Sequence, residues 1–169
     1  VWDRLAGLLA VIGQAVPNFW LGLLLILLFA VALHWLPTSG RGSWQQLIMP
    51  ATALAAASIA RYARLARSTM LDVLRQDYIR TAHAKGLAGH TVLWRHAFKN
   101  ASISLITTTG LEIGRLLGGA VVIEQIFAWP GIGRVTVQAL LNRDFAVVTA
   151  AVVLFAIIYT VANLLTDIA

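Results

Sequence analysis

Long apolar runs are the feature that most limits what this chain can fold into. Residues Phe19–Leu36 include no Asp, Glu, Lys or Arg, and Phe145–Ile168 is apolar almost throughout. Hydrophobic residues make up 59% of the chain and charged residues 12%, against roughly 45–50% and about 25% in soluble domains. Because so few charges cannot cover a water-facing surface, we expect an all-α, polytopic bundle of membrane-spanning helices in a lipid bilayer.

Four segments have the length and apolar character of spans. They are Phe19–Leu36, about Leu47–Leu71, about Ala101–Ile126 and about Phe145–Ile168. An earlier apolar stretch, Leu5–Val16, ends at Pro17, and a proline breaks or kinks a helix. We therefore expect Leu5–Val16 to lie at the membrane interface or to form a bent entry into the first span.

The two ends of the sequence indicate a part of a longer protein. The chain begins with Val1 rather than Met and stops at Ala169 within an apolar run. It also lacks the basic start, short apolar core and small-residue cleavage site of a signal peptide. We expect residues 1–169 to form a single transmembrane domain that is an internal fragment, with two or more spans missing upstream.

Positive charge is concentrated in one stretch of the chain. Eight of the thirteen Lys and Arg residues lie between Arg61 and Lys99, opposed there only by Asp72 and Asp77. Such an excess marks a cytoplasmic loop in a membrane protein, so the net charge of +6 does not indicate nucleic-acid binding. Alternation of the spans then places Gly40–Gly42 and Trp129–Arg143 outside.

Three arginines recur at every third position near the end of the second predicted span. Arg61, Arg64 and Arg67 would suit a voltage sensor, in which stacked arginines cross the membrane field. They would equally suit a cytoplasmic helix end, where long basic side chains extend to the interface. The series continues directly into the polar residues Asp72 and Arg75, which favours the second interpretation.

The third predicted span carries charges within its apolar sequence. Glu112 and Arg115 lie near its middle and can neutralise each other at i,i+3 spacing. Charges at that depth should face protein or water rather than lipid, so they form either a structural ion pair or part of a hydrophilic lumen. Glu124, near the outer end, belongs to the same candidate translocation path or gate, or simply reaches the interface.

The same span carries a stripe of glycines at four-residue spacing, Gly110, Gly114 and Gly118. Small residues let membrane helices approach closely. We expect the stripe to pack against the second span, which is rich in small residues, or against a partner subunit. The pattern is compatible with static packing and with a gating or dimer-facing role.

The basic stretch contains two predicted short helices within a cytoplasmic loop, residues 77–99. Asp77 is a candidate N-cap, and Gly86 supplies a left-handed stop after Lys85. A second helix is expected from about His90 to Lys99, after a bend at Gly86 and Gly89. Two short helices projecting from the membrane would suit insertion into a groove on a partner protein.

The loop also resembles a known family. Its segment Arg80-Thr81-Ala82-His83-Ala84-Lys85-Gly86-Leu87 resembles the coupling loop, or EAA loop, of ATP-binding-cassette importer permeases, in the form used by the dipeptide, oligopeptide, glutathione and nickel branch. The match to the general Glu-Ala-Ala pattern is partial. Further segments resembling that branch are Pro17–Gly22, Arg95–Ala101 and Gly118–Gly131.

The resemblance implies a permease subunit in a bacterial inner membrane. Its partners would be two ATP-binding subunits, a second permease subunit and an extracytoplasmic substrate-binding protein. ATP and Mg would bind to the ATP-binding subunits, with no cofactor on this chain. The implied residues of ATPase coupling are Tyr78, Arg80, Thr81, Ala82, Lys85 and Gly86.

The sequence itself indicates no catalytic chemistry. There is no Gly-x-x-x-x-Gly-Lys-Ser/Thr phosphate loop, no Gly-x-Ser-x-Gly motif and no cysteine. The four histidines lack metal-binding spacing, so we expect neither an enzyme nor a metal site. An ion-coupled carrier or channel subunit is the alternative function, and the cargo, whether peptide, glutathione or nickel chelate, stays open.

Overall fold

The computed structural model describes residues 16–168, and every regular element among them is helical. The elements are α2 (Asn18–Leu25), the π-helix η1 (Ile26–Ala32), α3 (Gln45–Leu74), α4 (Asp77–Ala84), α5 (Gly89–Thr91), the π-helix η2 (Val92–Phe98), α6 (Lys99–Ile126), α7 (Ile132–Leu141) and α8 (Phe145–Ile168). The all-α prediction is confirmed. The expectation for Leu5–Val16 falls, apart from Val16, outside the described residues.

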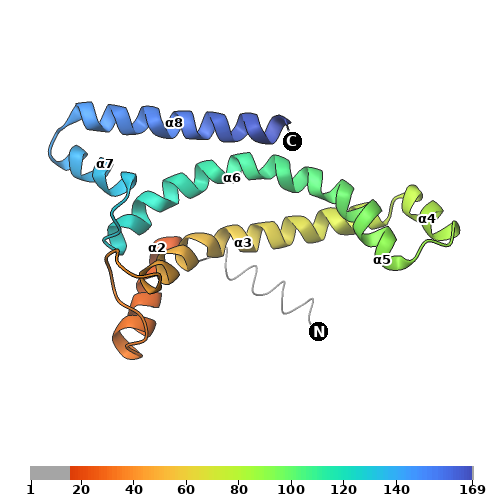
Figure 1. Ribbon diagram of the computed structural model, residues 1–169, viewed down its shortest axis with the longest axis horizontal. Coiled ribbons are helices and arrows are strands. Elements are labelled where there is room, and N and C mark those ends of the chain that lie inside the picture. The colour runs from red at the N-terminus through yellow and green to blue at the C-terminus, as the bar shows by residue number, and fades with distance from the viewer. Residues whose placement is uncertain (1–15, 169) are drawn as a thin grey trace.

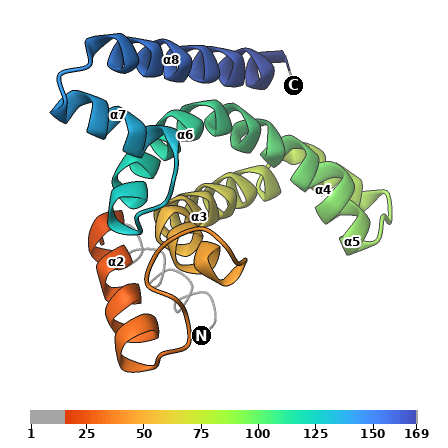
Figure 2. The same cartoon turned by 60° about the vertical axis from the view of Figure 1, so that its left-hand side comes forward.

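Helix α6 occupies the middle of the molecule. Figure 1 shows α3 along one side of it and α8 along the other, and both helices contact it. Helices α4 and α5 lie at one end, whereas α2 and the turns that precede α3 and follow α6 lie at the opposite end (Figures 1 and 2). The arrangement therefore separates the basic stretch from both predicted outer loops.

Two helices among residues 16–168 have the length and composition of a membrane span, Gly89–Ile126 and Phe145–Ile168. Helix α3 is 30 residues long, but arginines interrupt its apolar character. The predicted span Phe19–Leu36 is wrong at its C-terminal end, because the helix ends at Ala32 and the chain turns at His34, whose φ is +55°. Helix Asn18–Ala32 is only about 22 Å long at 1.5 Å per residue, shorter than a hydrocarbon core of about 30 Å.

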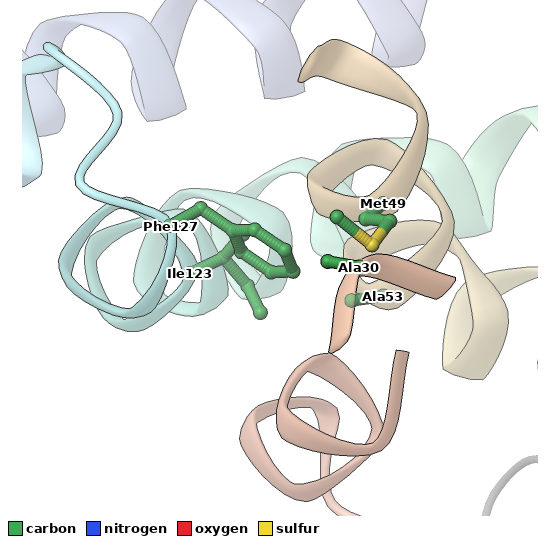
Figure 3. Packing of buried hydrophobic residues seen from close by; sticks show 5 residues of the cluster. All are labelled: Ala30, Met49, Ala53, Ile123 and Phe127. Atoms are coloured by element: carbon green, nitrogen blue, oxygen red, sulfur yellow. The ribbon is translucent and has the colours of Figure 1, made fainter. Parts of the chain in front are cut away.

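The helices are joined at the α2 end by a small apolar core. Its buried members, drawn in Figure 3, are Ala30, Met49, Ala53, Ile123 and Phe127. The Phe127 ring fills the space above Gly22, where an added Cβ would lie 3.2 Å from it. The amide of Gly40 also donates to the Phe127 carbonyl at 3.3 Å. This bond joins the predicted loop Gly40–Gly42 to the residue that caps α6, just before the predicted loop Trp129–Arg143, so the two predicted outer loops begin at the same end of the molecule.

The glycine stripe meets a different helix from the one expected. An added Cβ on Gly110 would lie 2.5 Å from Asn163 Oδ1, and one on Gly114 would lie 2.7 Å from the Tyr159 ring. Asn163 and Tyr159 belong to α8, so the expected packing against the second span is wrong for these two positions, whereas packing against a partner subunit stays a prediction. Spacing alone could not reveal this, because it places the glycines on one face of α6 without saying which helix covers that face.

Candidate functional site

Helix α4 is a short helix with well-defined ends. It begins at Asp77, with Gln76 rather than the predicted Asp77 in the N-cap position. At the other end, Gly86 has φ +76°, as its predicted stop role requires, and its amide donates to the His83 carbonyl at 2.9 Å. No atom of the described residues lies within 4 Å of a Cβ added to Gly86, so the constraint there is backbone conformation and not space.

One face of α4 is packed against the rest of the chain. Ile79 and Ala82 are buried with Val92 and Ala97, and Met70 and Val73 from the end of α3 cover this cluster. Ala82 therefore faces inward in the described chain, and its implied role in ATPase coupling stays a prediction. Its small size lets α4 lie close to η2.

The other face of α4 is open. The described structure leaves Arg80, Thr81 and Lys85 exposed, and the Arg80 side chain is 79% exposed in a 3.4 Å pair with Asp77. Tyr78 is partly held, because its hydroxyl accepts a 2.7 Å hydrogen bond from Asn100 Nδ2. The structure thus presents two of the predicted cations, Arg80 and Lys85, to solvent from a firmly anchored helix.

The second predicted loop helix is not a separate element. Residues Gly89–Ile126 form one continuous helix through α5, η2 and α6. The sequence from His90 to Thr109 contains neither Gly nor Pro, the residues that most readily end a helix, and this absence was the overlooked signal. The predicted cytoplasmic end is therefore a direct extension of α6.

Aromatic residues project from that extension. Trp94 and Phe98 form an edge-on pair with ring centroids 5.3 Å apart, and Trp94 is 64% exposed. Leu87 and Leu93 are exposed in the same region of the chain. We call these four residues, together with Arg80 and Lys85, the coupling end. An exposed apolar group beside cations is typical of a protein-binding surface.

A buried carboxylate joins α6 to α3. Glu112 is 2% exposed, and its Oε2 accepts a 3.1 Å hydrogen bond from Arg61 Nε while Oε1 pairs with Arg61 Nη2. Ser58 Oγ donates to Oε1 at 2.6 Å. Arg61 is therefore directed at α6 and does not simply extend to the interface, as the sequence had suggested for all three arginines.

The predicted pair of Glu112 and Arg115 exists, but it is the weaker of the two ion pairs. Arg115 Nη1 donates to Glu112 Oε2 at 3.3 Å. Sequence spacing did not reveal Arg61 as a partner of Glu112, because residues 61 and 112 are remote in sequence. Position along the helices could have indicated this pair. At 1.5 Å per residue, Arg61 lies roughly 24 Å from Gln45, where α3 begins, and Glu112 lies roughly 21 Å from Ile126, where α6 ends. Because α3 and α6 are antiparallel and these two ends lie together, Arg61 and Glu112 are at similar depth.

Glu124 has a different position from the other two candidate path residues. Its Oε2 accepts a 2.8 Å hydrogen bond from the amide of Arg134, near the start of α7. Arg134 Nη1 in turn donates to the Ala128 carbonyl at 2.7 Å. Gly133 passes so close to α6 that an added Cβ would lie 2.6 Å from Val121 Cα. These contacts give Glu124 a clear structural role in fixing α7 against α6.

Comparisons with known proteins agree with the resemblance seen in the sequence. Residues 1–169 match the family described as binding-protein-dependent transport system inner membrane component. The chain is 45% identical over 166 residues to the glutathione transport system permease protein GsiC of Escherichia coli and 46% identical to that of Salmonella typhimurium. Each alignment covers 98% of this chain and 54% of the relative, so the chain spans about half the length of these relatives.

Proposed function

Because the chain belongs to the family of binding-protein-dependent transport system inner membrane components, we propose that it is part of the permease subunit of an ATP-driven importer. The observation that carries the proposal is the family match along all 169 residues. The two long apolar helices, Gly89–Ile126 and Phe145–Ile168, suit a subunit embedded in the inner membrane. In this proposal the chain transports and does not catalyse a covalent reaction.

In the proposed assembly, different subunits hydrolyse ATP, form the translocation path and deliver the substrate. Two ATP-binding subunits bind ATP and Mg and hydrolyse ATP, while a second permease subunit completes the path. An extracytoplasmic binding protein delivers the substrate. The coupling end supports this division, because it combines exposed cations with exposed aromatic residues and lies away from both predicted outer loops (Figure 1).

The continuous helix Gly89–Ile126 suggests how a movement would be transmitted. A force on Leu93, Trp94 or Phe98 would act directly on α6, because no loop lies between η2 and α6. A force on α4 would reach the same helix through the buried contacts of Ile79 and Ala82 with Val92 and Ala97. Since α6 contacts α3, α7 and α8, a shift of α6 would change several packed interfaces together. Alternating access between two packed arrangements fits this geometry.

The proposed cargo is a short peptide of the glutathione type. Both relatives named above are glutathione transport permeases, and the sequence resemblance points to the same branch. The nickel chelates and longer peptides handled elsewhere in that branch are less favoured, since no relative named here carries them. An ion-coupled carrier remains the contrasting function to be tested.

The direct test is reconstitution of the full-length permease with its partner subunits in lipid vesicles. We expect ATPase activity that rises when glutathione-loaded binding protein is added outside, together with ATP-dependent uptake. Uptake driven by an ion gradient without ATP would instead establish a secondary transporter.

The coupling end can be tested in the same vesicles. Arg80→Glu combined with Lys85→Glu should lower co-purification of the ATP-binding subunits at least severalfold, because both exposed cations would be reversed. Arg41→Glu is the matched control, since Arg41 is also exposed but lies in the loop before α3 at the other end. Equal retention of the ATP-binding subunits in both variants would remove the coupling role from α4.

A further inference from the structure

Among residues 16–168, the ionic cluster between α3 and α6 does not balance its charges. It contains two arginines, Arg61 and Arg115, and one carboxylate, Glu112. Arg61 meets both oxygens of Glu112, and Ser58 completes the shell of that carboxylate. Arg115 shares only one oxygen at 3.3 Å, and its side chain is 60% exposed against 36% for Arg61. Arg115 is therefore the cation in excess.

The position of Arg115 makes this excess significant. It lies 11 residues before Ile126, the end of α6, or about 16 Å at 1.5 Å per residue. That depth is close to the middle of a hydrocarbon core of about 30 Å. An uncompensated guanidinium is costly in lipid, so its exposed donors must meet water, another protein group or a solute.

Arg115 also lines an open cavity beside α6. It has a volume of about 640 Å³ and lies between α6 and α8, with Gly114, Gly118, Phe155 and Tyr159 among its walls. This volume is within the range of small-molecule sites, about 300–1,000 Å³. The wall of the cavity is uncrowded at Gly118, because a Cβ added there would have no neighbour within 4 Å among the described residues. Apart from Arg115 and Tyr159 the lining side chains are apolar.

We propose that Arg115 binds the carboxylate of an anionic, peptide-like substrate during its passage through this cavity. The inference rests on the proposed function and adds the chemistry by which the path recognises its cargo. A guanidinium offers paired donors that match a carboxylate in a bidentate arrangement. The bidentate Arg61–Glu112 pair acts as the positioning element, because it satisfies Glu112 and leaves most of the Arg115 donors available.

Reduced glutathione is a suitable probe because its charges are unequal. The carboxylate of its glutamyl end lies beside its own ammonium group, whereas the glycyl carboxylate has no such neighbour. The glycyl monoethyl ester removes that second charge and changes little else. The glycyl carboxylate is therefore the group that we expect Arg115 to bind.

The experiment compares uptake of the acid and the ester by the complete reconstituted transporter. Both probes are supplied at concentrations that saturate the binding protein, as measured separately. The variants are Arg115→Gln and Arg115→Lys, with Arg41→Gln as the control at an exposed arginine far from the cavity. Arg115→Gln leaves the Arg61–Glu112 pair neutral and intact, so the protein should still fold and assemble.

We expect Arg115→Gln to reduce uptake of the acid by roughly tenfold or more, as loss of a charged hydrogen bond implies, while uptake of the ester stays within about twofold. Arg115→Lys should retain part of the acid uptake, and Arg41→Gln should match the parent. Equal losses for acid and ester would overturn the inference and indicate that Arg115 pairs with a partner subunit. Unchanged acid uptake would overturn it as well. Failure of the parent transporter to take up either probe would instead refute the proposed function.

Discussion

At the residue scale, two glycines of the same stripe have different surroundings. Gly114 faces the Tyr159 ring on α8, and Gly118 faces open space. We expect Gly114→Ala to lower stability by about 1–3 kcal/mol through overpacking. Gly118→Ala should be neutral or stabilising by up to about 1 kcal/mol, because Ala favours a helix more than Gly does. Thermal unfolding of the full permease in detergent measures both.

Tyr159 supplies the control for that comparison. If the ring causes the conflict, Tyr159→Leu should reduce the penalty of Gly114→Ala in a double-mutant cycle and leave the effect of Gly118→Ala unchanged. Equal destabilisation by the two alanines would mean that α8 does not pack on α6 as the structure shows.

At the element scale, the connection of α3 to α6 depends on one carboxylate. Glu112→Gln leaves both Arg61 and Arg115 without their anion. Removal of one partner from a fully buried ion pair costs about 3–5 kcal/mol, and the partial exposure of both arginines lowers that cost here. Arg61→Gln should cost less, since Glu112 keeps its bonds to Arg115 and Ser58. The two variants should therefore differ in unfolding temperature, with Glu112→Gln the lower.

A second link between the same helices provides the reference for this measurement. Tyr62 donates from its hydroxyl to Thr109 Oγ1 at 2.9 Å, a neutral hydrogen bond worth about 1 kcal/mol. Tyr62→Phe should thus be milder than either charge-removing variant. A Glu112→Gln protein as stable as Tyr62→Phe would show that the cluster does not hold α3 to α6.

At the scale of the whole molecule, the ends of the bundle define its orientation in the membrane. Cysteine can be placed freely, because the chain has none. Leu141→Cys, at the last residue of α7 and 77% exposed, should react with a membrane-impermeant thiol reagent from outside. Leu87→Cys, at the coupling end, should react only from the cytoplasmic side. The reverse labelling pattern would invert the assigned topology.

The choice of these positions comes from the structure. Gly131 lies in the same predicted outer loop as Leu141, at the start of α7, but an added side chain there would collide with the Glu124 carboxylate. Labelling at Gly131 would therefore report on a distorted α6–α7 turn. Leu141 and Leu87 are exposed and avoid this difficulty.

The sequence determined the class of the molecule because hydropathy and charge distribution act locally along the chain. The apolar runs predicted helices, and the excess from Arg61 to Lys99 predicted a distinct basic end. The left-handed stop at Gly86 also followed from sequence, since only glycine adopts that backbone without strain. Family motifs along the chain predicted the family, which the comparison then confirmed.

Tertiary structure decided which of the predicted faces and charges meet. It set α8 rather than α3 against Gly114, and it gave Glu112 the remote partner Arg61. It also turned Ala82 inward and merged the second loop helix with α6. Periodicity fixes the direction of a side chain on its own helix but carries no information about the neighbour that covers it. Which helix becomes that neighbour depends on how well the side chains of whole helices pack together, and this packing exists only in the folded chain.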